Sequence, residues 1–129
     1  MPQMDAIGVT VTDMEGSVSF YRLLGLPIAE GAESEGHTEV ALPTGMRLMF
    51  DTIDVVRSFR DFEPGDGDRS VAFAFRCKDP AEVDGTFRRL TDAGHRADVA
   101  PFDAVWGQRY ATVLDPDGNP VDLYAPLEA

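Results

Sequence analysis

Several features that are common in other proteins are scarce or missing in this sequence of 129 residues. There is one cysteine, Cys77, so no disulfide can form within the chain, and such cysteine usage is typical of the reducing cytoplasm. No apolar run approaches the ~20 residues that a membrane-spanning helix needs, and the N-terminus lacks the basic and then apolar pattern of a secretory signal. We therefore expect a cytoplasmic protein that does not enter a membrane.

Basic residues are also scarce. Lysine and arginine number 11 against 23 aspartates and glutamates, which gives a formal net charge of -12. A polyanion repels nucleic acid and anionic lipid and attracts cationic ligands, so we expect neither nucleic acid nor a membrane as a partner. The acids are spread over both halves of the chain. A solvated surface is therefore a simpler interpretation than a role in steering cations.

Motifs of phosphate binding, redox and nucleophilic catalysis are missing as well, namely a Gly-rich loop, a CxxC pair and a nucleophile elbow. His37 and Glu39 lie two apart on a predicted strand and face the same way, so they could offer two metal ligands, although a solvated strand face is favoured. His95 follows a helix stop and is expected in a surface loop. Cys77 is expected to be a core thiol.

The first half of the sequence, residues 1–64, predicts a strand, a helix and then three short strands. Apolar and polar residues alternate near its start, which indicates a strand with one buried face. The stripe of Val18, Tyr21 and Leu24 indicates an amphipathic helix that ends at Gly25. The predicted elements are a strand at 7–12, a helix at 14–24 and strands at 26–29, 37–42 and 46–51.

The second half, residues 65–129, repeats this order. Asp79 and Pro80 are typical of a helix start, and Gly94 is typical of a helix end. The predicted elements are a strand at 71–75, a helix at 79–90 and strands at 97–100, 108–114 and 121–124. We therefore predict an α+β fold of two tandem βαβββ modules, 1–64 and 65–129, in one compact domain. The segment 51–69 between them could be a linker or a lid.

The chain closes on a strand, a turn of sequence Asp115-Pro-Asp-Gly-Asn119, and a strand that carries Asp122. Together with Val9–Asp13, Ser17–Tyr21 and Val71–Phe73, this order resembles the vicinal oxygen chelate superfamily. That superfamily contains glyoxalase I, extradiol dioxygenases, fosfomycin-resistance enzymes and bleomycin-resistance proteins. The resemblance implies that the two modules form a curved mixed sheet around a cleft, and it implies a homodimer.

Metal-dependent members of that superfamily carry His and Glu ligands on the first and last strands of each module. Carried over residue by residue, those positions fall on Ala6, Met49, Ser70 and Asp122. Alanine offers no lone pair, a thioether is soft, and a serine hydroxyl is a weak neutral ligand, so only Asp122 is a competent ligand for Zn, Ni, Mn or Fe(II). We therefore expect no metal and no other cofactor.

Strand alternation also predicts which side chains would line the cleft. Small residues on the first strands leave room, while methionine and aromatic residues supply apolar surface. Arg109 could contact an anion or form a structural salt bridge, and Trp106 could be a stacking platform or a plug between modules. The predicted lining residues are Ala6, Gly8, Arg47, Met49, Phe59, Ser70, Ala72, Trp106, Arg109, Tyr110, Asp122 and Tyr124.

Two classes of function fit these features. We favour a metal-free protein that captures a small, flat, partly apolar ligand in the cleft, with antibiotics among the candidates. The alternative is a lyase, isomerase or dioxygenase, either metal-free or with a non-standard metal site. In a metal-free enzyme Asp122 would be the general base and Tyr110 or Tyr124 the acid, but the sequence assigns no catalytic residue.

Overall fold

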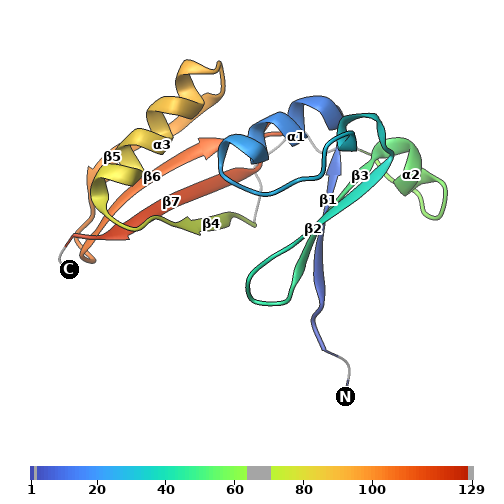
Figure 1. Ribbon diagram of the computed structural model, residues 1–129, viewed down its shortest axis with the longest axis horizontal. Helices are drawn as coiled ribbons and strands as arrows, with labels where there is room; N and C mark the ends of the chain where they lie inside the picture. The colour runs from blue at the N-terminus through green and yellow to red at the C-terminus, as the bar shows by residue number, and fades with distance from the viewer. Residues whose placement is uncertain (2, 64–70, 128–129) are drawn as a thin grey trace. The chain divides into compact units, whose positions relative to one another are not determined.

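The computed structural model describes residues 1, 3–63 and 71–127 and shows an α+β fold built from two units, Met1–Asp66 and Gly67–Ala129 (Figure 1). The first unit contains β1 (Ala6–Val11), α1 (Met14–Leu23), the 3-10 helix η1 (Ala32–Ser34), β2 (His37–Ala41), β3 (Arg47–Thr52) and α2 (Ile53–Arg57). The second contains β4 (Phe73–Arg76), α3 (Pro80–Asp92), β5 (Arg96–Asp103), β6 (Gln108–Leu114) and β7 (Pro120–Pro126). No helix among the described residues is both long enough and apolar enough to cross a membrane.

In the first unit, α1 covers one face of a mixed sheet whose strands run in the order β1-β3-β2. β1 is parallel to β3, whereas β2 is antiparallel to it. The buried side chains Val9, Val11 and Leu48 point to the helix side, and the ring of Tyr21 lies 5.0 Å from that of Phe50. The intervening side chains of each strand form the opposite, open face of this sheet.

The strand predicted at 26–29 is wrong. This stretch is irregular, and Arg22 of α1 turns back onto it and donates hydrogen bonds to the carbonyl oxygens of Ile28 and Ala29. In its described residues the first unit is thus βαββ with an added helix, rather than βαβββ.

That added helix, α2, occupies part of the segment that the sequence left open as a linker or a lid. The side chain of Thr52 caps it by accepting a hydrogen bond from the backbone N–H of Val55, 3.3 Å away. Residues 64–70 lie outside the described part of the chain, so the choice between linker and lid stays a prediction.

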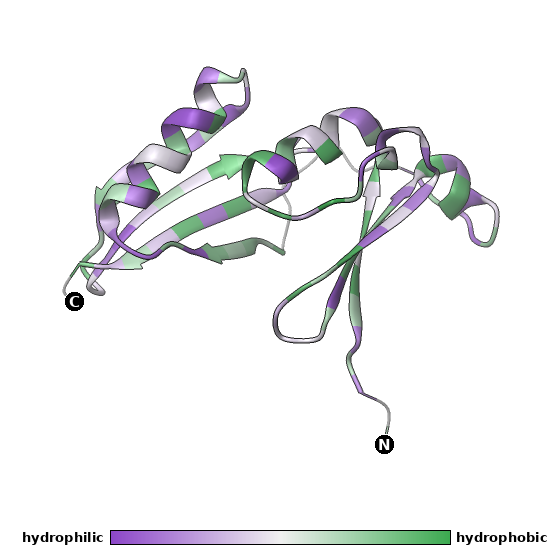
Figure 2. Cartoon of the chain, viewed as in Figure 1, coloured by the Kyte–Doolittle hydropathy of each residue, from purple (hydrophilic) through white to green (hydrophobic). Residues whose placement is uncertain are grey.

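The second unit has the full βαβββ order, with strands arranged β4-β7-β6-β5 and α3 packed on one face. The predicted helix start is confirmed, since Asp79 accepts a hydrogen bond from the N–H of Glu82 at 2.9 Å and Pro80 occupies the first turn. Cys77 is buried, as predicted. Figure 2 shows the alternation of hydrophobic and hydrophilic residues along β7, which separates a helix-covered face from an open face.

Candidate functional site

The turn between β6 and β7 fixes the strand that carries Asp122. The buried carboxylate of Asp115 accepts hydrogen bonds from the backbone N–H groups of Asp117 and Asn119, at 2.9 and 2.8 Å, and from the Asn119 side chain. Gly118 adopts a φ of 84°, which favours glycine. Pairing of β6 with β7 is continuous beyond this turn, and it sets Thr112 directly opposite Asp122.

Asp122 lies on the open face of the second sheet and is held by two hydroxyl groups. Tyr110 donates a hydrogen bond to Oδ2 at 2.5 Å, and Thr112 donates one to Oδ1 at 2.7 Å. Tyr124 is opposite Tyr110 on the same face. On the other side of Asp122 the neighbouring strand carries the small residue Ala74. We call Asp122, Tyr110 and Thr112 the carboxylate triad.

Burial, reinforced by the hydrogen bond to Asp122, raises the pKa of Tyr110 to about 12. Tyr110 therefore keeps its proton throughout the neutral range. That proton is directed at Oδ2 of Asp122. The hydroxyl is a fixed donor within the carboxylate triad rather than a group that exchanges protons near neutral pH.

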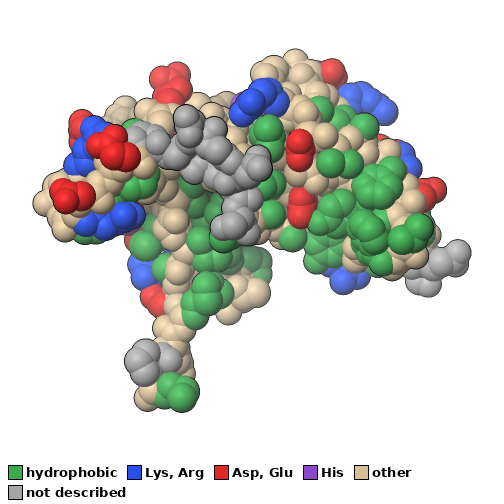
Figure 3. Space-filling view, turned by 180° about the vertical axis from the view of Figure 1, so that it is seen from behind, with side chains coloured by type: hydrophobic (Ala, Val, Ile, Leu, Met, Phe, Trp, Pro, Cys, Tyr) green, Lys and Arg blue, Asp and Glu red, His purple; other side chains and the backbone are tan. Residues whose placement is uncertain are grey.

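Three aromatic rings extend from the carboxylate triad, and we call Phe102, Trp106 and Tyr110 the aromatic cluster. The Trp106 ring centroid lies 5.5 Å from that of Tyr110 and 6.1 Å from that of Phe102, in edge-to-face arrangements. Trp106 is 59% exposed and is oriented by a 2.9 Å hydrogen bond from its indole N–H to Gln108. Figure 3 shows hydrophobic side chains gathered over the second unit, at the right of the view.

The open face of the first sheet carries a different arrangement, a chain of alternating charges. The two ring nitrogens of His37 face Asp51 and Glu39, at 2.5 and 3.0 Å. Arg47 in turn bonds to Glu39 at 3.0 Å and to Asp5 at 2.7 Å. These contacts raise the pKa of His37, with the Asp51 hydrogen bond as the largest cause, and lower that of Glu39.

Among the residues that the structure describes, neither face offers the donor set that a divalent metal needs. Ala6 and Met49 stand at two of the positions that the family resemblance implies, and both oxygens of Asp122 already accept hydroxyl hydrogen bonds. His37 directs its two nitrogens at different carboxylates, so these groups do not converge on one point. Among the described residues, no group of three or more His, Cys, Asp or Glu side chains could hold a metal ion.

Most of the predicted lining residues lie on the open faces of the two sheets. Ala6, Gly8, Arg47 and Met49 share the open face of the first sheet, and Tyr110, Asp122 and Tyr124 share that of the second, with Trp106 in the adjoining turn. Ala72 immediately precedes β4, and Ser70 lies outside the described residues. Their role in ligand binding stays a prediction.

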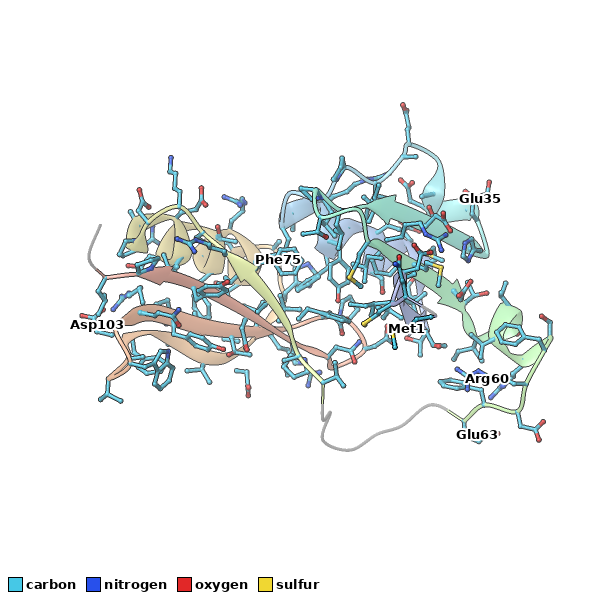
Figure 4. All side chains as sticks on the ribbon, turned by 90° about the horizontal axis from the view of Figure 1, so that it is seen from below. Met1, Glu35, Arg60, Glu63, Phe75 and Asp103 are labelled. Carbon is cyan, nitrogen blue, oxygen red and sulfur yellow. The ribbon has the colours of Figure 1, made fainter. Side chains whose placement is uncertain are left out.

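Arg109 and Phe59 do not join these faces. Arg109 lies on the helix-covered side, where it binds Asp84 of α3 through two hydrogen bonds and also Asp103. The salt-bridge alternative is therefore the one that the structure contains, and the pKa of Arg109 is raised, first by Asp84. Phe59 follows α2 and is 68% exposed. Figure 4 labels Phe75 and Asp103, on the two edge strands of the second sheet.

The sequence does not identify Phe102 as a contributor. Phe102 joins the aromatic cluster because β5 and β6 pair with register shifts that set it opposite Tyr110. The predicted strand ends at residue 100, so Phe102 falls outside it. The contact of Asp51 with His37 could not be predicted either, because it depends on the pairing of β2 with β3.

Comparisons with known proteins agree with this architecture. A glyoxalase-related enzyme from Fulvimarina pelagi superposes with a TM-score of 0.81 at 20% identity, over 97% of this chain and 88% of that one. A glyoxalase/bleomycin resistance protein/dioxygenase from Nocardioides gives 0.75 at 25% identity, over 100% and 86%. An Agrobacterium tumefaciens protein solved by NMR gives 0.72 at 28%, over 98% of each chain.

No curated protein sequence matches the chain. The family model described as "Glyoxalase/Bleomycin resistance protein/Dioxygenase superfamily" matches residues 3–123, which is nearly the whole sequence. The chain therefore belongs to the glyoxalase/bleomycin resistance protein/dioxygenase superfamily.

Proposed function

We propose that this protein is a metal-free binder of a small, flat, partly apolar molecule, and that the ligand docks on the open face of the second sheet. The observation that carries this proposal is the junction of the carboxylate triad with the aromatic cluster, which share Tyr110. A polar anchor beside apolar ring surface is the usual composition of a small-molecule site. Antibiotics of this shape are candidates, as the family description suggests.

The proposed mode of action is capture rather than turnover. A general acid works best when its pKa lies near the operating pH, whereas the pKa of Tyr110 is raised to about 12. Asp122, the candidate general base, has both oxygens engaged by hydroxyl donors. A lyase, isomerase or dioxygenase built on this face would have to break those contacts before it could move a proton.

A thermal-shift screen of flat aromatic compounds, followed by NMR, tests the proposal. At a ligand concentration of about 100 times Kd, binding should stabilise the fold by roughly 2.7 kcal/mol, a shift of several degrees in Tm. Because the sequence has one tryptophan, the Trp106 indole N–H gives a single NMR signal that must move with each true ligand. The replacement Trp106→Ala should weaken binding. Phe59→Ala is the matched control, since Phe59 is exposed and belongs to the first unit.

Two results would contradict the proposal. If ligands shift NMR signals of the first unit only, the binding site does not lie on the second sheet. If a ligand is chemically converted during the NMR experiment, the enzyme alternative is favoured. Elemental analysis after incubation with Zn, Ni, Mn and Fe(II) and gel filtration tests the metal-free part. Retention of one metal per chain would refute it.

A further inference from the structure

We infer that the ligand of the second sheet is an organic cation, namely a flat aromatic molecule with an ammonium, quinolinium or guanidinium group that meets Asp122. This inference rests on the proposed function and specifies the charge of the ligand. Three observations support it: both hydroxyl protons of the carboxylate triad are engaged, the aromatic cluster lies beside the triad, and the chain has a net negative charge.

The carboxylate triad has no donor left to offer. A hydroxyl group has one proton and two acceptor lone pairs, and the protons of Tyr110 and Thr112 both point at Asp122. A carboxylate has about four acceptor positions, of which two are filled here. The triad therefore presents only acceptors and one negative charge, which match a ligand that donates hydrogen bonds and is positive.

The aromatic cluster favours the same class of ligand. Ring faces of tryptophan, tyrosine and phenylalanine attract cations within about 6 Å. Trp106 and Phe102 stand nearly perpendicular to each other, at an interplanar angle of 86°, and both are exposed. Two exposed rings at such an angle, beside a carboxylate, offer more than one ring surface to a positive group.

Two positive side chains, Arg76 and Arg96, share this face and would oppose a cationic ligand. Arg96 begins β5 opposite Leu114, at the end of that strand away from the aromatic cluster. Arg76 stands on β4 opposite Tyr124, next to Ala74, which is opposite Asp122. Arg76 is exposed and forms no ion pair with another described residue, so its charge is screened by solvent. The net charge of -12 outweighs it at longer range and draws cations towards the molecule.

Three probes with one ring system separate the possibilities at about pH 8: N-methylquinolinium, neutral quinoline and quinoline-2-carboxylate. Titrations are followed by the Trp106 indole signal and by the backbone amides of Tyr110 and Asp122. We expect the cation to bind at least about tenfold more tightly than the neutral probe, and its affinity to fall as salt is added. The anion should bind most weakly.

Asp122→Asn is the decisive variant, because it keeps the size of the side chain and removes the charge. It should reduce the cation's affinity about tenfold and leave that of quinoline nearly unchanged. Asp103→Asn is the matched control, since Asp103 contacts Arg109 on the helix-covered side. Should Asp122→Asn fail to fold, Tyr110→Phe serves instead. It removes the hydroxyl that donates to Oδ2 of Asp122 but keeps the charge, so the preference for the cation should persist.

The outcomes distinguish this inference from the proposed function. Equal binding of all three probes at Trp106 would overturn the cation assignment and leave small-molecule binding intact. Preference for the carboxylate probe would overturn it in favour of recognition by Arg76. Failure of every probe to move the Trp106 signal would overturn both.

Discussion

His37 should make the stability of the first unit depend on pH. Its contacts with Asp51 and Glu39 raise its pKa above the ordinary value of 6.5. A histidine with a raised pKa in the folded state stabilises the fold fully below its unfolded pKa, and this contribution is lost as pH rises through the folded pKa. Arg47 and Asp5 complete the set of charged groups along this chain of contacts.

The magnitude follows from the exposure of the side chain. His37 is 45% exposed, so solvent screens both ion pairs and the contribution of such a pair is about 0.2–1 kcal/mol. His37→Gln should therefore lower the free energy of unfolding by roughly that amount at about pH 6, and by much less at about pH 9. Circular dichroism is the suitable probe, because it follows the secondary structure of both units, whereas Trp106 belongs to the second.

NMR titration gives a direct test, because the chain has two histidines. Burial lowers the pKa of His95, so the two ring signals should titrate on opposite sides of 6.5. Asp51→Asn should lower the His37 pKa more than Glu39→Gln does, since the Asp51 hydrogen bond is the larger cause. A His37 that titrates at or below 6.5, or a His37→Gln effect that grows with pH, would refute this reasoning.

Two further variants test the framework of the second unit. Asp79→Ala should destabilise it by about 1 kcal/mol, because the capping hydrogen bond from the Glu82 N–H is lost. Urea unfolding followed by Trp106 fluorescence measures this loss. An unchanged urea midpoint would show that the cap is dispensable. Asp115→Ala should cost more, roughly 2–4 kcal/mol, since the part-buried N–H groups of the β6–β7 turn lose a charged, buried acceptor. A smaller loss than that of Asp79→Ala would contradict the role given to Asp115.

Many elements of the fold could be predicted from residues that are close in sequence. The Asp79-Pro80 start of α3, the alternation of β1 and β7, and the turn before Pro120 depend on residues close in sequence, so they could be identified from the chain alone. The assignment of Asp122 and Tyr124 to one face of β7 likewise follows from a period of two.

The partners of long polar side chains could not be predicted in this way. Arg22 binds the carbonyls of Ile28 and Ala29, in the stretch 26–29 where a strand was expected. Arg109 points to the face opposite Tyr110 by strand alternation, but its partner there, Asp84, lies 25 positions away on α3. Both contacts depend on the folded path of the backbone, which residue type and spacing do not specify.

The sequence by itself determined the elements of the second unit, the family resemblance and the lack of metal ligands at Ala6 and Met49, because these depend on residue type and spacing. Tertiary structure alone decided that Tyr110 and Thr112 both donate to Asp122 and that Phe102 meets Trp106. The physical reason is that strand register, set by the β6–β7 turn and by the shifts between β5 and β6, determines which side chains become neighbours.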